Sequence, residues 1–560
     1  MQNNQILLKE IIKSEFDESD MFQKENDFFE FFAATQVLKN YNLNDDEILN
    51  GITDGGLDGG CDSAYLFLNG DLVSVDQIST LTASKGSTLA FIIIQSKNTA
   101  SFNEDAIMKW KTLSSNLFDM SKPTQEFEGR YSEAVLEKFK MLRDSMTKLV
   151  RSQIKVKIQY FYVSLATEIH PNVRDQADEL KASTIALFPS AAIDVSFVGA
   201  DKLMELYNLD SEISINLQLA DQPVALGTHK DYVALINIAT YFKFITDESG
   251  SLQKRFFEAN VRDYQGNNSV NSSIAETLNA EAEEDFWWLN NGVTIIAEEI
   301  SLVNSRELLL VNPEIVNGLQ TSTEIYNYFS SKGDKLSNET RNVLVRLIVP
   351  ESEESRDRII FATNNQTNIP KSSLRVTDAI HLQIEMYFKS RGLYYDRRKN
   401  YYKNQKKKSS EIVGVSFLAQ CLITLILRKP DFARARPSTL LTDEETYGKL
   451  YGENFDLNAY YKATVLGKRV QKNLSTTAEM SSAERSDVLF YLLYAVVSKT
   501  LGKKEISFTD ISNFNLDLIT DDFINSTKIN VYEKYKSLGG NGRVAKSNTF
   551  INEIDALLGL

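Results

Sequence analysis

The sequence predicts an α/β domain at the N-terminus, an α+β domain in the middle and a mainly α C-terminal region. Strand and helix patterns alternate up to about residue 208, which is typical of α/β domains. Between residues 225 and 400, apolar strand patterns alternate with segments rich in Asn, Gln and Thr, and helical periodicity dominates after residue 410. These patterns predict three domains, at 1–220, 225–410 and 411–560, which agrees with the usual domain size of about 100–200 residues.

The N-terminal domain opens with a helix pattern and a turn that precede its first strands. Apolar residues at three- and four-residue spacing predict a helix over 21–41, and the segment GITDGGLDGGCD at 51–62 predicts a turn because it is rich in Gly and Asp. The strands expected in this domain are 64–68, 72–75, 89–97, 156–165 and 192–198. The later helices expected are 101–120, 131–153, 172–186 and 201–208.

The composition excludes several kinds of active site. The three histidines, His170, His229 and His381, are isolated in the sequence, so a zinc site or another site built from clustered histidines is not expected. A hydrolytic site in this chain therefore has to use Asp, Glu, Gln, Asn and Lys. The net charge of −15 argues against nucleic-acid binding over the whole surface, so any basic groove is local.

The chain is expected to be cytoplasmic and to make no contact with a membrane. Its longest apolar run, at 417–427, is shorter than the roughly 20 residues that a membrane-spanning helix needs. Its first 20 residues lack the basic start and apolar block of a secretory signal. The low cysteine count, with only Cys61 and Cys421, favours a reducing compartment.

A candidate catalytic site lies between the Gly-rich turn and the strand at 89–97. Asp62 ends the turn, and the strand ends in Gln95-Ser96-Lys97. Side chains alternate along a strand, so Gln95 and Lys97 are expected on one face with Ser96 turned away and only its backbone carbonyl facing the site. A carboxylate, an amide oxygen and a lysine suit a divalent metal on a phosphodiester and a cation that stabilises the developing charge.

This order of residues resembles the PD-(D/E)xK nuclease superfamily, in its Mrr-like form with Gln in place of the second acid. The resemblance implies a mixed sheet with flanking helices, Asp62 and Gln95 as ligands of Mg²⁺ or Mn²⁺, and Lys97 as the residue that stabilises charge and positions water. It also implies an acid on the preceding helix, for which Glu30 is the first candidate. Glu25 and Asp27 lie about one turn earlier and remain alternatives, and Asp58 is a further acid in the turn. The alternative reading of the whole segment is a turn and a buried strand with a polar end.

A second set of motifs occurs in order along the middle of the chain. The motifs are FEANVRDY at 257–264, WWLNNGVT at 287–294, IVNGLQTS at 315–322, FATNNQTNI at 361–369 and YYDRRK at 394–399. Together they resemble the AIPR family, named for abortive-infection phage resistance in bacteria, from about residue 225 to about residue 455. The resemblance implies a recognition or sensor domain that works with the N-terminal nuclease domain in phage defence.

The polar residues of these motifs are suited to recognition rather than to bond cleavage. Amide side chains offer paired donors and acceptors to bases or phosphates, and arginines can hold phosphate with two hydrogen bonds. The candidate nucleic-acid-binding residues are Arg262, Asn291, Asn317, Gln320, Asn364, Gln366, Arg397 and Arg398. The alternative is that the amides satisfy buried backbone groups. Trp287 and Trp288 are expected in the core rather than stacked on bases.

Basic and aromatic residues are concentrated between Arg391 and Lys408, where the sequence is RGLYYDRRKNYYKNQKKK. This combination suits single-stranded or unstacked nucleic acid, so the stretch is the best candidate for a local basic groove. The alternative is a solvated loop whose lysines serve solubility. The helices from 456 onward carry no motif and are expected to form a scaffold or an oligomerisation element.

These observations predict a bacterial anti-phage nuclease, dependent on a divalent metal and restrained until infection, with DNA favoured over RNA as its partner. A homo-oligomer and a phage-derived trigger are both compatible with this prediction. The first alternative is a regulator that binds nucleic acid or nucleotides and carries a catalytically silent nuclease-like domain. A second alternative is a protein-binding module of a larger defence complex.

Overall fold

A computed structural model describes the chain except residues 1–2, 20, 42, 54–55, 84, 209–213, 227–230, 247–249, 251, 258–268, 281–283, 365–378, 398–399, 406, 436–442, 453–455 and 478. The chain forms two compact units. Unit 1 consists of Met1–Leu209 together with Leu382–Leu560, and unit 2 consists of Asp210–His381. The sequence predicted three consecutive domains, whereas in the structure the first and last thirds of the chain share one unit.

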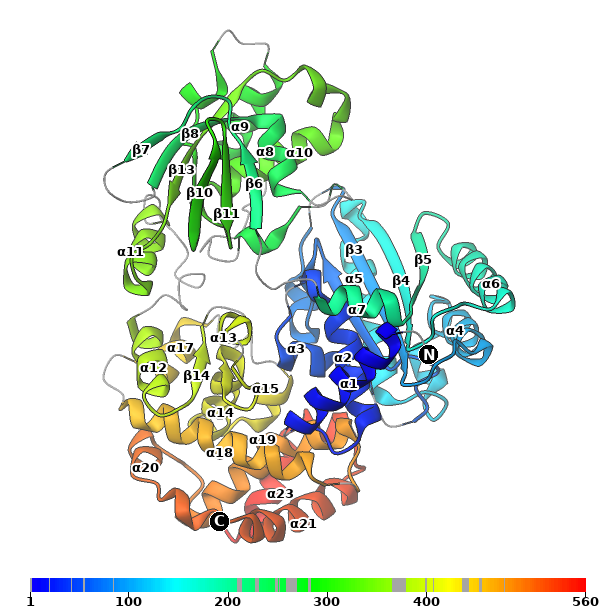
Figure 1. The fold of residues 1–560 in the computed structure, drawn as a ribbon. Coiled ribbons are helices and arrows are strands. Elements are labelled where there is room, and N and C mark those ends of the chain that lie inside the picture. Colours follow the sequence, from blue (N-terminus) through cyan, green and yellow to red (C-terminus); the bar gives the residue numbers. More distant parts are fainter. Residues whose placement is uncertain are drawn as a thin grey trace. The chain divides into compact units, whose positions relative to one another are not determined.

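The N-terminal part of unit 1 is built on a five-stranded mixed sheet in the order β2-β1-β3-β4-β5 (Figure 1). Its strands are β1 (Ser63–Leu68), β2 (Asp71–Leu72), β3 (Thr88–Lys97), β4 (Lys155–Ser164) and β5 (Ala192–Val198). β1 runs antiparallel to β2 and β3, while β3, β4 and β5 are parallel to one another. The expected mixed sheet with flanking helices is therefore present.

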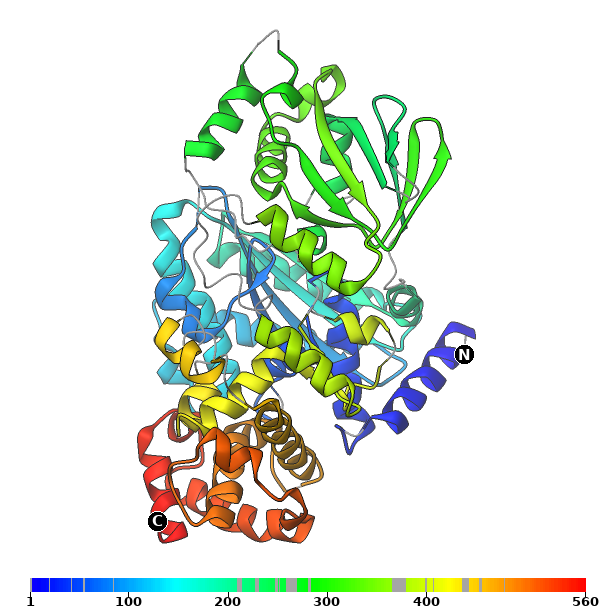
Figure 2. The same ribbon diagram turned by 90° about the vertical axis from the view of Figure 1, so that its left-hand side faces the viewer.

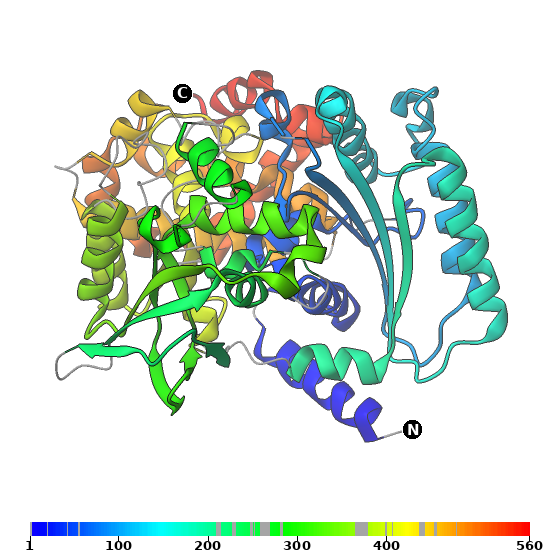
Figure 3. The ribbon, with the colours of Figure 1, turned by 90° about the horizontal axis from the view of Figure 1, so that it is seen from above.

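Alternating side chains of β3 bury both faces of this sheet. Leu89, Phe91 and Ile93 pack against α4 (Glu104–Leu117), α5 (Glu133–Leu149) and α6 (Pro171–Leu187). Ala90, Ile92 and Ile94 pack on the other face, against α1 (Asn3–Glu18), α2 (Glu25–Val37), α3 (Asp45–Gly51) and α7 (Ala200–Asn208). Figure 3 shows α6 on one side of the strands and α1 with α7 on the other. A strand buried on both faces is nearly all apolar, which explains the run LAFIII before the polar end.

The C-terminal part of unit 1 is helical, as expected. Its main helices are α14 (Val415–Leu425), α18 (Leu457–Ser475), α19 (Ser482–Leu501), α21 (Asp521–Ser537) and α23 (Asn548–Leu558), and α19 contacts each of the other four. These helices are orange to red in Figure 2, apart from the yellow α14. Two smaller strands, β14 (Tyr394–Asp396) and β15 (Ile412–Gly414), pair with each other and precede α14 in the chain. The short α13 (Tyr401–Asn404) connects them in the sequence.

Polar contacts link the two parts of unit 1. The short helix α22 (Gly542–Ala545) and the residue after it contact the acidic side of α5 and the segment before it. Arg543 pairs with Glu128, Lys546 pairs with Glu137, and the backbone N–H of Gly542 donates to Glu133 Oε2 at 2.8 Å. The last helices of the chain are thus tied to a helix that covers the N-terminal sheet.

Unit 2 contains two sheets of its own. One has the order β12-β9-β13-β8-β7 and the other the order β10-β11-β6. Their strands are β6 (Ser214–Gln218), β7 (Val224–Leu226), β8 (Asp231–Asn237), β9 (Val293–Ile296), β10 (Glu299–Asn304), β11 (Glu307–Val311), β12 (Glu314–Asn317) and β13 (Asn342–Ile348). The helices named below are α8 (Ile238–Ile245), α9 (Ser269–Asn279), α10 (Leu319–Ser331) and α11 (Glu353–Asn364). In the described parts of both units, the helices are all too short or too polar to cross a bilayer.

Candidate active site

The end of β3 and the start of β1 bring Asp62 and Gln95 together. β1 pairs with β3 so that Ser63 lies opposite Ile94, and the backbone N–H of Asp62 donates to the carbonyl of Ile94 at 2.9 Å. The next pair along the ladder is therefore Asp62 and Gln95, whose side chains share a face. Lys97 lies on the same face two residues further along β3. The sequence prediction that these three residues meet is in agreement with this geometry.

The described polar contacts of the Asp62 side chain all end on one oxygen, Oδ2. Gln95 Nε2 and the backbone N–H of Ser96 each donate to it at 2.7 Å, and Ser96 Oγ donates at 3.1 Å. Lys97 Nζ lies 3.8 Å from the same oxygen. Ser96 was expected to be turned away from the site, and this expectation is wrong, because both its N–H and its hydroxyl hold the carboxylate.

Burial of Asp62 changes its proton affinity. The residue is only 3% exposed, whereas the side chain of Lys97 is 44% exposed. Loss of water around the carboxylate raises the pKa of Asp62 to about 6, although Lys97 and the hydrogen bonds from Ser96 act in the opposite direction. The site therefore combines a buried, oriented carboxylate with a lysine that reaches solvent. This arrangement is expected of a site whose substrate binds at the protein surface.

Gly60 shapes the floor of this site. Its φ of +82° lies in the left-handed region, and a Cβ atom at this position would lie 2.9 Å from Gln95 Oε1. Trp110 of α4, which is fully buried, donates from Nε1 to the Gly60 carbonyl at 2.5 Å. Asp58 accepts a hydrogen bond from the Gly60 N–H at 2.7 Å. The absence of a side chain at position 60 thus keeps space open beside the amide oxygen of Gln95.

Replacing Trp110 with Phe is expected to lower the free energy of unfolding by about 1–3 kcal/mol, because the buried carbonyl of Gly60 loses its donor. The measurement is thermal or urea unfolding of the variant beside the parent protein. Trp288→Phe is the matched control, since Trp288 is 61% exposed and forms no such hydrogen bond in the described structure. An equal effect of the two substitutions would show that the Trp110 hydrogen bond contributes nothing.

The donor set fits a magnesium or manganese ion that is held only partly by protein. Asp62 Oδ1 and Gln95 Oε1 accept none of the hydrogen bonds that the described residues make to these side chains. No group of three or more His, Cys, Asp or Glu side chains within the described ranges could hold a metal. Mg²⁺ commonly takes one or two protein oxygens and completes its shell with water and substrate phosphates, so two free oxygens suffice for a weak site.

The acid from the helix that precedes the site is the least defined part of the prediction. Glu25, the first residue of α2, accepts a hydrogen bond at 2.9 Å from Asn98, the residue directly after Lys97. Glu30 is half-buried on the same helix. None of the polar contacts described for Asp62, Gln95 or Lys97 is made by Glu30. Glu30 therefore stays a prediction, while Glu25 is the helix acid with a described contact to the end of β3.

Motifs that are far apart in the sequence meet in unit 2. Asn317 at the end of β12 lies opposite Thr294 of β9, which in turn lies opposite Arg346 of β13. Asn317 Nδ2 also donates to the carbonyl of Thr363 in α11. Three of the five motifs therefore contribute to one end of this sheet. Arg346, which is exposed, was missed by the sequence analysis because it belongs to none of the motifs.

The remaining amides of these motifs have mixed environments. Asn290 Oδ1 accepts from the Gly292 N–H at 2.9 Å and from Thr321 Oγ1 at 3.2 Å, which joins the loop before β9 to α10. Gln320 is half-buried and Asn291 is exposed. Arg262, Gln366 and Arg398, together with the side chain of Asn364, lie outside the described residues. Asn290 thus acts structurally, as the alternative reading proposed, while Asn291 remains accessible to a ligand.

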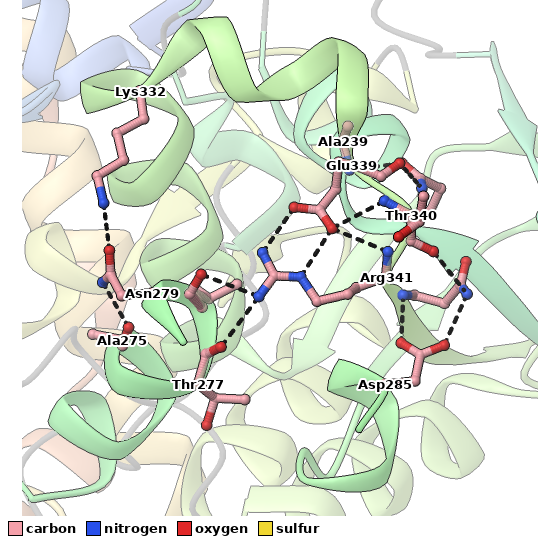
Figure 4. Close-up of polar contacts among 12 residues, drawn as sticks. Ala239, Ala275, Thr277, Asn279, Asp285, Lys332, Glu339, Thr340 and Arg341 are labelled. Carbon is pink, nitrogen blue, oxygen red and sulfur yellow. Dashed lines mark hydrogen bonds and ion pairs between the residues drawn. The ribbon is translucent and has the colours of Figure 1, made fainter. Parts of the chain in front are cut away.

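A network around Arg341 holds the C-terminal end of α9 in unit 2 (Figure 4). The guanidinium of Arg341 donates to both carboxylate oxygens of Glu339 at 2.8–2.9 Å, and to the carbonyls of Thr277 and Leu278 at 3.1 Å. Burial alone would raise the pKa of Glu339, but the hydrogen bonds from Arg341 hold it below its ordinary value. This arginine caps the C-terminal end of α9, so its role is structural.

Asp285, two residues before Trp287, is tied to the sheet in the same region. Its carboxylate accepts from the backbone N–H of Asn342 at 2.8 Å and from Asn342 Nδ2 at 3.0 Å. The two tryptophans that follow lie edge to face with ring centroids 6.2 Å apart. Trp288 was expected in the core, and this is wrong: the side chain is 61% exposed, and Trp287 is half-buried.

Several residues of the stretch from Arg391 to Lys408 have partners within unit 1, so they are not simply exposed to solvent. Arg397 is buried and pairs with Glu385 at 3.0 Å, and the Tyr402 hydroxyl donates to the same carboxylate at 2.7 Å. Lys403 pairs with Asp45 of α3. Arg397 was predicted to bind nucleic acid, but its place in this buried pair gives it a structural partner within unit 1.

The comparison with known protein families agrees with the motif pattern. Residues 257–538 match the family described as AIPR protein. The chain belongs to the AIPR family. The AIPR match begins inside unit 2 and ends just after α21 of unit 1, further along the chain than the motifs at 257–399 extend. Membership of the AIPR family suggests a role in abortive infection, a form of anti-phage defence. Neither the curated proteins nor the solved structures provide a match to this chain.

Proposed function

We propose that this AIPR protein is a metal-dependent nuclease of anti-phage defence, with Asp62, Gln95 and Lys97 as its catalytic residues and DNA as its first substrate to test. The observation that carries the proposal is the convergence of these three side chains at the adjoining ends of β1 and β3. A buried acid with a raised pKa beside an accessible cation is a feature that occurs at functional sites more often than elsewhere.

Each residue has a distinct part in the proposed reaction. Asp62 and Gln95 would hold Mg²⁺ or Mn²⁺ through Oδ1 and Oε1, and an ion held there would supply Lewis-acid chemistry to the phosphate and to a water molecule. Lys97 would stabilise the negative charge that develops on the phosphate as the attacking oxygen approaches. Ser96 keeps the carboxylate in one orientation through its two hydrogen bonds. Because free nuclease activity harms the host, restraint until infection is part of the proposal.

The test is a cleavage assay on plasmid DNA, single-stranded DNA and RNA, in Mg²⁺, Mn²⁺ or EDTA. The parent protein is expected to cut at least one substrate only with metal. Lys97→Ala is expected to reduce the rate by about 100-fold or more, because it removes a charge that acts in the transition state. Asp62→Ala is expected to reduce cutting to background. Circular dichroism checks that both variants remain folded.

The control is Lys111→Ala, on the helix beside the site, whose side chain pairs with Glu179 at 2.5 Å. It is expected to cut like the parent. Equal cutting by the parent, Asp62→Ala and Lys97→Ala would contradict the site assignment. Metal-independent binding of nucleic acid without any cutting would favour the other candidate function, a regulator with a catalytically silent nuclease-like domain.

A further inference from the structure

We propose that Lys109 of α4 binds a phosphate of the nucleic-acid backbone next to the one that is cut. This inference rests on the proposed nuclease function and adds a substrate-binding residue to the same site. Lys109 lies outside the Gly-rich turn and the Gln-Ser-Lys strand end, and the sequence alone gave no reason to select it.

Lys109 lies across Gly60 from the amide oxygen of Gln95. A Cβ atom at position 60 would lie 2.9 Å from Gln95 Oε1 and 3.2 Å from Lys109 Cβ. These two atoms are therefore no more than about 6 Å apart. The lysine side chain has a flexible four-carbon stem, so its ammonium can reach the space beside the Gln95 oxygen.

The local structure holds the backbone of Lys109 in place. Trp110, the next residue of α4, donates its indole N–H to the Gly60 carbonyl at 2.5 Å. A Cβ atom at position 60 would also lie 3.4 Å from the carbonyl oxygen of Ala106, one turn before Lys109 on α4. This turn of α4 and Gly60 are therefore packed together, and the start of the Lys109 side chain is fixed relative to Asp62 and Gln95.

The positive charge of Lys109 is available to a ligand. Lys109 is exposed and forms no ion pair with a carboxylate in the described part of the chain. Asp105 lies one turn earlier on α4, and it too is exposed and within 4 Å of no described cation. By contrast, Lys111 pairs with Glu179 at 2.5 Å. On a chain of net charge −15, an unpaired lysine next to the candidate catalytic residues is well suited to hold a phosphate.

Lys97 and Lys109 would contact different phosphates of the substrate. Lys97 lies 3.8 Å from Asp62 Oδ2 and is the cation at the reacting phosphate, whereas Lys109 lies across Gly60 on α4. A lysine at this distance contacts the substrate in the ground state and the transition state alike. Because Lys109 would stabilise the bound substrate and the transition state equally, it would lower KM and leave kcat unchanged.

The test measures binding and cleavage separately. Binding of a fluorescein-labelled 30-base-pair DNA is followed in EDTA over a series of salt concentrations, which requires no catalysis. Lys109→Ala is expected to weaken binding on the order of tenfold at low salt and to reduce the slope of log Kd against log salt by about one. Lys109→Arg is expected to restore both, and Lys111→Ala is the matched control with an ion-paired lysine.

In cleavage assays, Lys109→Ala is expected to raise KM on the order of tenfold with kcat unchanged. Unchanged binding and unchanged salt slope in Lys109→Ala would overturn the inference, as would a loss in kcat with KM unchanged. A parent protein that binds DNA through Lys109 but never cuts it would contradict the proposed function and leave the phosphate contact standing. If the parent cuts DNA and Lys109→Ala has the same KM as the parent, the phosphate contact is contradicted and the proposed nuclease function stands.

Discussion

Replacing Asp62 with Asn is expected to raise the free energy of unfolding of the metal-free protein at pH 7 by about 1–3 kcal/mol, while it abolishes cleavage. The Asp62 carboxylate is 3% exposed and its pKa is raised to about 6 by burial. Each unit of pKa corresponds to about 1.4 kcal/mol of stability. Asn keeps an oxygen that accepts from the Ser96 N–H, and it carries no charge that has to be buried.

The pH dependence provides the sharper form of this prediction. In the folded protein the carboxyl binds its proton more tightly than in the unfolded chain, so the parent loses stability as the pH rises from about 4 to about 6. Asp62→Asn lacks this loss. The stability difference between the two proteins is therefore expected to be small at pH 4, to grow through this window and to stay constant above it.

The measurement is thermal unfolding in EDTA at a series of pH values, following the transition that belongs to unit 1. Asp105→Asn is the control, because Asp105 is an exposed acid close to the same site. A variant that is less stable than the parent at pH 7 would contradict the prediction, since the hydrogen bonds of the carboxylate would then outweigh the cost of its burial. A gain in stability together with loss of cutting is typical of active-site residues.

Replacing Arg397 with Met is expected to destabilise unit 1 by about 3–5 kcal/mol, which is the usual cost of removing one partner from a buried ion pair. The substitution removes the cation that pairs with the buried Glu385 carboxylate, to which the Tyr402 hydroxyl also donates. Urea unfolding at neutral pH measures the effect. The double variant with Glu385→Gln is expected to recover part of the loss, because the buried charge is then gone.

Arg391→Ala is the control for this prediction. Arg391 is exposed, lies over the ring of Tyr387 and belongs to the same basic stretch, so its removal is expected to change stability by less than about 1 kcal/mol. An Arg397→Met protein with parental stability and weaker nucleic-acid binding would show that the original prediction of a phosphate contact for Arg397 is correct and that its structural role is minor.

Local patterns predicted the strands and the pairing of the candidate site well. The strand at 192–198 is where it was expected, and β1 and β3 begin within one residue of the predicted starts. Alternation along β3 correctly put Gln95 and Lys97 on one face. The same rule failed for Ser96, because at this strand end both its backbone N–H and its hydroxyl donate to the Asp62 carboxylate, and strand alternation takes neither contact into account.

Long-range organisation could not be predicted from the sequence. Lys546 pairs with Glu137 across 409 residues of chain, and neither Glu137 of α5 nor Lys546, the residue after α22, belongs to a distinguishing motif. The exposure of Trp288 was missed for a related reason. Tryptophan is usually buried, and the hydrogen bonds that hold Asp285, three residues before Trp288, come from Asn342, which is 57 residues away in the chain.

The division of unit 1 between the two ends of the chain has a consequence for its synthesis. A ribosome releases Met1–Leu209 first and must then translate Asp210–His381 before any of the second half of the unit appears. At about 5–20 residues per second, this interval alone is on the order of 10–30 s. During that time the chain lacks the Gly542–Lys546 segment, which contacts Glu128, Glu133 and Glu137 in the finished protein. A chain that is terminated before residue 382 would carry Asp62 and Lys97 without the second half of the unit in which they lie, so unit 1 gains its contacts to Glu128, Glu133 and Glu137 only after the Gly542–Lys546 segment has been made.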